Sequence, residues 1–105
     1  MMITFVETRL FTRLVSTYLG VDEYCRLQMA LQQNPEAGDV IPGSGGIRKL
    51  RWAAKGRGKR GGYRVIYCNA PLRGAIWLLT IYPKGVADDI PAHILRRIRK
   101  EVESA

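Results

Sequence analysis

Acidic residues are missing from almost half of this chain. Residues 40–87 of the 105 include no aspartate and no glutamate, yet they include ten lysines and arginines. Residues 1–39 carry three basic and five acidic side chains, and residues 88–105 carry four of each, so the net charge of +8 originates in the central segment. A basic segment interspersed with aromatic residues is typical of a surface that binds polyphosphate, and nucleic acid is the first expectation.

Metal-ligating residues are also scarce. The sequence has one histidine, His93, and two cysteines, Cys25 and Cys68, which form no Cys-X-X-Cys motif. A structural zinc site normally needs four such ligands, most of them at short spacings. We therefore expect no metal site and no cofactor, and we expect both cysteines to be free, buried thiols.

Long apolar runs are absent as well. The longest, Ala75–Leu79, is far too short to span a bilayer, and the first residues lack the apolar core of a signal peptide. We therefore expect a cytoplasmic protein without a membrane partner. A length of 105 residues with 47% hydrophobic residues suits a single domain over residues 1–105 with one modest core.

The N-terminal third predicts a strand and two helices. Ile3–Val6 is a short apolar run, and Thr8 is a suitable N-cap for the helix that follows. The apolar face of that helix consists of Phe11, Leu14, Val15, Tyr18 and Leu19. A second helix is predicted from Asp22 to Asn34, where the following proline stops it. The short break at Gly20 predicts a helical hairpin.

The remainder predicts a sheet and a last helix. A short strand, Asp39–Ile41, precedes longer strands over residues 47–54, 62–69 and 75–82, and a last helix is predicted over Asp88–Glu103. Alternation along residues 47–54 sets Leu50, Trp52 and Ala54 on one face and the cations Lys49 and Arg51 on the other. The order of elements predicts an α+β fold with helices packed on an antiparallel sheet.

Four segments carry a resemblance to a known family. They are PEAGDVIPGSGGIRKLRWA, the basic glycine-rich loop KGRGKRGG, the strand GGYRVIY and the apolar strand ending in IYPK. Together with the order of elements, they resemble the RelE/HigB toxins of type II toxin–antitoxin pairs, and the HigB branch most of all. The resemblance implies the RelE-like fold and a ribosome-dependent endoribonuclease that cuts messenger RNA. It also implies a cognate antitoxin, a HigA-like helix-turn-helix protein.

The resemblance also implies site residues. The arginine of GYR is Arg64, the two basic residues that precede it are Lys55 and Arg57, and the basic residue past the central strand is Lys84. Many members supply a tyrosine or histidine from the C-terminal region, which this chain lacks between residues 86 and 90, and Tyr82 is the nearest substitute. The further cations that we expect to bind RNA are Arg48, Lys49, Arg51, Lys59 and Arg60.

These residue types suit RNA cleavage by the 2′-hydroxyl, which needs a base, an acid and cations around the phosphate, but no metal. We expect Lys55 to be the base, because neighbouring cations lower the pKa of a lysine, although bound phosphate raises it. Arg64 is the expected phosphate clamp, since a guanidinium grips two oxygens at once. Tyr82 or Lys84 is expected to protonate the leaving group or to orient the phosphate.

Structural interpretations stay open beside these. The loop KGRGKR can be a solvated loop, and Arg64 can be a structural arginine paired with a carboxylate. Strand aromatics such as Tyr63 and Tyr67 fit a core better than a base-stacking surface. The last helix carries four cations, Arg96, Arg97, Arg99 and Lys100, which fit a solvated helix face. ParE-like relatives, which poison DNA gyrase, and a non-catalytic RNA- or ribosome-binding module are the alternative functions.

Overall fold

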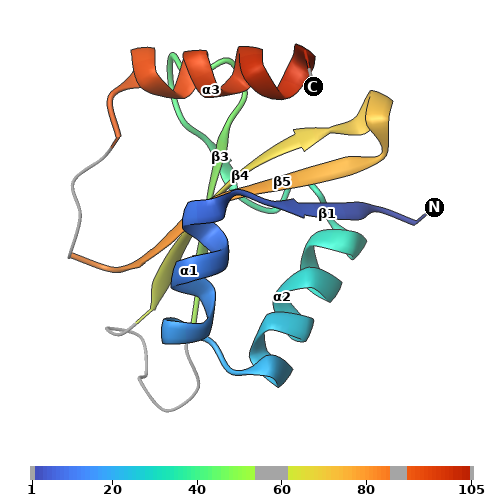
Figure 1. Ribbon diagram of the computed structural model, residues 1–105, viewed down its shortest axis with the longest axis vertical. Coiled ribbons are helices and arrows are strands. Elements are labelled where there is room, and N and C mark those ends of the chain that lie inside the picture. Colours follow the sequence, from blue (N-terminus) through green and yellow to red (C-terminus); the bar gives the residue numbers. More distant parts are fainter. Residues whose placement is uncertain (1, 54–61, 86–89, 105) are drawn as a thin grey trace.

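The computed structural model describes residues 2–53, 62–85 and 90–104, and these form the expected α+β fold (Figure 1). In chain order the elements are β1 (Thr4–Glu7), α1 (Arg9–Tyr18), α2 (Val21–Gln33), β2 (Asp39–Val40), β3 (Arg48–Trp52), β4 (Tyr63–Ala70), β5 (Ala75–Pro83) and α3 (Ala92–Ser104). A 3₁₀ turn, Pro71–Arg73, joins β4 to β5.

The five strands of the described part form one mixed sheet in the order β1-β5-β4-β3-β2. Strands β2 to β5 pair antiparallel with their neighbours, as predicted, but β1 runs parallel to β5. The prediction of an antiparallel sheet is therefore wrong at this edge. A long stretch of chain separates β1 from β5, so no tight turn fixes their relative direction, and parallel neighbours require such a connection.

Helices cover both faces of the sheet (Figure 1). Helices α1 and α2 pack on one face, where Phe11 and Leu27 belong to the same core cluster as Val65 of β4. Helix α3 packs on the other face, where Leu95 meets Ile66. Because β4 is buried on both sides, its sequence reads as a nearly continuous apolar run.

A β-bulge in β5 decides which of its residues face α3. The register pairs Ile66 with Thr80 but Tyr67 with Leu78, so Leu79 is the extra residue. Leu78 and Ile81 consequently pack in the same core cluster, although regular alternation would place residues three apart on opposite faces. The bulge thereby sends Tyr82, the next residue along, to the side covered by α3.

A buried tyrosine ties the segment after α2 to the sheet. The Tyr67 hydroxyl accepts a hydrogen bond from the Gly38 N–H at 3.0 Å and donates one to the Pro35 carbonyl at 2.9 Å. A Cβ atom at Gly38 would lie 2.9 Å from the Lys49 backbone carbonyl and 3.0 Å from the Tyr67 ring. Only glycine permits this close approach, which seats β2 against β3.

Two further predictions need correction. Ile90 and Pro91 are not helical, and the first backbone hydrogen bonds of α3 run from Ile94 and Leu95 to the Pro91 carbonyl. The helix therefore starts later than predicted, because a residue that precedes proline disfavours the helical conformation. Cys25 is exposed on α2, whereas Cys68 is buried as predicted.

Candidate functional site

The sheet register aligns three of the predicted site residues in one row across β3, β4 and β5. Arg51 pairs with Arg64, and Arg64 pairs with Tyr82. Directly paired residues project from the same face of a sheet, so all three lie on the side of the sheet covered by α3. Lys49 lies on the same face, two residues before Arg51 along β3, and it pairs with Ile66. We call Lys49, Arg51, Arg64 and Tyr82 the cationic row.

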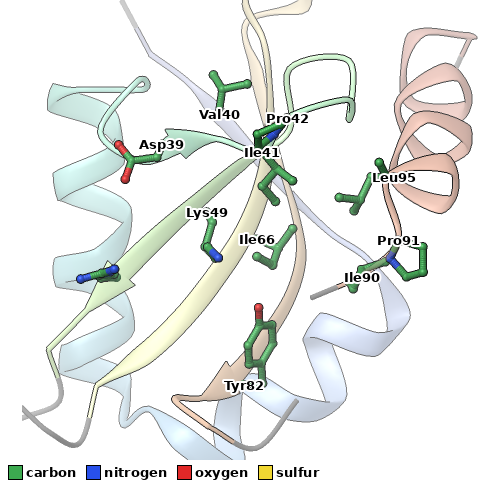
Figure 2. A pocket seen from close by; sticks show the side chains of 12 residues that line it. Asp39, Val40, Ile41, Pro42, Lys49, Ile66, Tyr82, Ile90, Pro91 and Leu95 are labelled. Atoms are coloured by element: carbon green, nitrogen blue, oxygen red, sulfur yellow. The ribbon is translucent and has the colours of Figure 1, made fainter. Parts of the chain in front are cut away.

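The cationic row adjoins a pocket of about 560 Å³ between the sheet and the start of α3. Its walls are partly apolar, and its lining comprises Asp39, Val40, Ile41, Pro42, Lys49, Arg51, Ile66, Tyr82, Ile90, Pro91, Ala92 and Leu95. Figure 2 shows Lys49 reaching into this space from β3 and Tyr82 from β5, with Ile90 and Leu95 across from them. The pocket therefore combines cationic side chains with an apolar wall.

The two arginines of the row lack a carboxylate partner in the described part of the protein, whereas Lys49 pairs across the strands with Asp39. Among the described residues, neither Arg51 nor Arg64 has an ion-pair partner, and the ion pair between Arg48 and Glu36, at 4.0 Å, lies away from the row. Like charges directly across two strands destabilise a sheet. A structural arginine would have a carboxylate beside it, so the described residues give no support to the structural interpretation of Arg64. An anionic ligand would supply the missing partner.

Arg48 is the predicted RNA-binding residue that the structure places apart from the row. It pairs with Tyr67, and its guanidinium donates to the Gly38 carbonyl at 2.7 Å and to the Glu36 carbonyl at 3.3 Å. These bonds hold the turn after α2. Arg48 is therefore engaged in the scaffold, whereas Lys49 and Arg51 lie in the row.

Lys84 lies at the end of the sheet that also holds the residues on either side of the basic loop. Its side chain is exposed, and its backbone N–H donates to the Gly62 carbonyl at 3.0 Å. Ala53 and Gly62 flank the loop on either side. The predicted site residues Lys55, Arg57, Lys59 and Arg60 lie outside the described residues.

The hydroxyl of Ser44, a residue that the sequence did not single out, shapes one wall of the pocket. Ser44 is buried, and its hydroxyl donates to the Ile41 carbonyl at 2.6 Å and accepts from the Ile47 N–H at 3.0 Å. These bonds fix the turn that carries Pro42. The turn residues around Gly38–Gly46 signalled a loop in the sequence, but no local signal indicated that it would face the start of α3.

Within the described ranges, no three His, Cys, Asp or Glu side chains gather closely enough to hold a metal ion. None of the helices there is long and apolar enough to cross a membrane. A comparison of the chain with models of known protein families finds no match.

The chemistry available to the row is that of phosphate recognition. Two guanidinium groups and an ammonium group on adjacent strands can bind several phosphate oxygens with charge-assisted hydrogen bonds. The Tyr82 hydroxyl, half-buried beside Arg64 in the register, can donate a hydrogen bond or a proton to an oxygen of the same group. Ile66 and Leu95 form an apolar wall beside these polar groups.

Proposed function

We propose that the protein is the toxin of a type II toxin–antitoxin pair, a RelE/HigB-like endoribonuclease that cuts ribosome-bound messenger RNA. The observation that carries the proposal is the Arg51–Arg64–Tyr82 row, with Lys49 beside it and no ion-pair partner for either arginine among the described residues. The sequence resemblance and the agreement between the predicted and observed order of elements support it.

In the proposed reaction, the RNA supplies its own nucleophile. The 2′-oxygen attacks the adjacent phosphorus while Lys55 removes its proton, and the bond from phosphorus to the 5′-oxygen breaks. The products are a 2′,3′-cyclic phosphate and a 5′-hydroxyl. Arg64 holds two phosphate oxygens as charge develops on them, and Arg57 adds a second cation. Tyr82 or Lys84 gives a proton to the departing 5′-oxygen.

Because such an enzyme would arrest its own host, we propose a cognate antitoxin, a HigA-like helix-turn-helix protein, as a second partner beside the ribosome and its message. All three act in the cytoplasm. The partner silences the toxin either by covering the cationic row or by preventing ribosome docking from the side of α1 and α2.

The test is single-turnover cleavage of message on programmed ribosomes, with a thermal melt of every variant. We expect Arg64→Ala to fold normally and to cut on the order of 10²–10³ times more slowly, the usual cost of losing one transition-state charge donor. Arg13→Ala is the matched control, because Arg13 is exposed on α1, on the opposite face of the sheet. Equal rates for the two variants would contradict the assignment of Arg64.

A second pair of variants tests whether Lys55 is the base. Lys55→Ala and Lys55→Arg should both lose activity, since arginine keeps the charge but does not release a proton at working pH. If Lys55→Arg cuts at the wild-type rate, Lys55 is a phosphate contact and not the base. If wild type produces no new message ends but causes cleaved DNA and stalled replication, the gyrase-poisoning alternative replaces the proposal. Ribosome binding without either effect identifies a non-catalytic module.

A further inference from the structure

Helix α2 carries an apolar stripe on the side that faces away from the core. Val21, Cys25 and Met29 recur at every fourth position, so they lie in line along about 12 Å of the helix. Val21 is 81% exposed, Met29 is 62% exposed, and Cys25 is an exposed free thiol. The buried residues of α2, Leu27 and Leu31, lie on a different side of the helix. We call Val21, Cys25 and Met29 the α2 stripe.

The α2 stripe has no task within the described part of the chain. Neither Val21 nor Met29 belongs to a core cluster or packs against one. In Figure 1, α2 lies at the margin of the molecule, and no described element covers its outer side. Single exposed apolar residues are normal on a protein surface, whereas aligned ones form a patch that marks an interaction surface.

Two residues of opposite charge flank the α2 stripe. Asp22 and Arg26 are exposed, and they too are four positions apart on the helix. Asp22 lies in the first turn, where an acid complements the helix dipole, but Arg26 lies in the second turn and has no such role. Neither forms an ion pair with any residue that the structure describes. The stripe therefore has an acidic and a basic group along one rim, each available to a partner.

We propose that the α2 stripe binds the α2 stripe of a second copy of this chain, with the two helices antiparallel about a twofold axis at Cys25. In this register Val21 of each copy meets Met29 of the other. Asp22 of each copy lies within about 3 Å, along the helix axis, of Arg26 of the other, a gap that an arginine side chain spans. Two ion pairs thus form at the rim, and the two helix dipoles run in opposite directions.

The order of the charges selects a second copy over other partners. A uniformly acidic partner would be repelled at Asp22, and a uniformly basic one at Arg26. A parallel pair of α2 helices would place each charge beside its like. The antiparallel copy satisfies both charges at once, and because the same patch is used on both sides, the assembly closes as a dimer.

The dimer is expected to be weak. Helix α2 has 13 residues and is therefore about 20 Å long, so a pair of such helices buries less than the roughly 1,600 Å² of a standard interface. We expect reversible association with a dissociation constant between about 1 μM and about 1 mM. Helix α2 and the cationic row lie on opposite faces of the sheet, so both rows stay exposed and the inference does not depend on the proposed function.

Sedimentation equilibrium of the full chain, from about 5 μM to about 1 mM, measures the association. Met29→Gln should raise the dissociation constant by about tenfold or more, because each dimer loses two apolar contacts. The matched control is Leu72→Gln, which removes a fully exposed apolar side chain from the turn between β4 and β5 and should dimerise like wild type. A monomeric wild type over the whole range overturns the proposal, and so does an equal effect of the two variants.

A charge swap tests the antiparallel order. Arg26→Asp and Asp22→Arg should each dimerise about tenfold more weakly than wild type, because two repulsive contacts replace two ion pairs. An equimolar mixture of the two variants should associate within about threefold of wild type, since each charge then meets its opposite on the other chain. Thermal melts of both variants check that they are folded. A mixture no tighter than either variant alone contradicts the register.

The thiol reports the position of the twofold axis. With oxidised glutathione, two Cys25 thiols form one disulfide, and the glutathione disulfide accepts the two electrons and two protons to become two thiols. Cys68 is buried and does not compete. The control carries Cys25→Ser with Ser16→Cys, which moves the thiol to an exposed position on α1. Wild type should cross-link at least about tenfold faster at equal concentration, and equal rates contradict an axis at Cys25.

Discussion

At the scale of single residues, strand position decides which side chains can act together. Arg64 alternates with buried neighbours: Tyr63 and Val65 point into the core under α1 and α2, so Arg64 must point to the side of α3. Tyr82 reaches the same side only because the bulge at Leu79 shifts the alternation in β5. The pairing of Arg64 with Tyr82 thus depends on one inserted residue.

The Tyr82 hydroxyl can be tested by removing a single oxygen atom. If it donates a proton or a hydrogen bond in the transition state, Tyr82→Phe should reduce single-turnover cleavage by on the order of 10²-fold. The affinity for unpaired RNA should hardly change, because the ring still fills its place. Tyr18→Phe serves as the control, since Tyr18 packs against Tyr63 in the opposite core cluster. Wild-type cleavage by Tyr82→Phe would leave Lys84 as the donor.

At the scale of elements, one threonine joins β1, α1 and β5. The Thr8 hydroxyl accepts a hydrogen bond from the Phe11 N–H at 3.0 Å, which caps α1, and donates one to the Leu79 carbonyl at 2.7 Å. The Thr8 N–H also donates to the Leu78 carbonyl at 3.1 Å. Thr8 therefore anchors the start of α1 to the strand that contains the bulge.

Thr8→Ala should lower the free energy of unfolding by about 1–2 kcal/mol, because it removes an N-cap and leaves the Leu79 carbonyl without that donor. Urea unfolding followed by circular dichroism measures the change. Thr12→Ala makes a matched comparison, since Thr12 is exposed within α1 and its hydroxyl donates to the Glu7 carboxylate in an exposed hydrogen bond. A loss as large in Thr12→Ala as in Thr8→Ala would show that the cap adds nothing specific.

At the scale of the whole molecule, two tyrosines link stability to alkaline pH. Burial raises the pKa of Tyr67 above its ordinary value of 10.0, although the Gly38 N–H and Arg48 partly offset this effect. Burial also raises the pKa of Tyr24, and a hydrogen bond to the Glu7 carboxylate raises it further. Both phenols therefore keep their protons longer in the folded protein than in the unfolded chain.

A raised folded-state pKa stabilises the protein fully below pH 10 and progressively less above it, because the unfolded chain then loses protons that the folded chain keeps. We expect the urea midpoint to fall as pH rises from about 10 to 11.5. Tyr24→Phe removes one of the two phenols, so its midpoint should fall less steeply over that range. Parallel curves for wild type and Tyr24→Phe would show that Tyr24 does not contribute.

The sequence by itself determined the type and order of the elements and the segregation of charge. Helical spacing, the Thr8 cap and strand alternation are local patterns, and each arises from residues within a few positions of one another. The absence of acids between residues 40 and 87 is likewise visible in any fold. The prediction that Lys49 and Arg51 share a face opposite Leu50 and Trp52 was confirmed for the same local reason.

Only the tertiary structure decided the parallel pairing of β1 with β5, the placement of α3 opposite α1 and α2, and the row of Arg51, Arg64 and Tyr82. The pocket wall formed by Asp39, Ile41 and Pro91 was likewise decided only by the tertiary structure. Each of these joins residues far apart in the chain. Their meeting depends on strand register, on the bulge in β5 and on which side chains fill the core, and no short stretch of sequence contains that information.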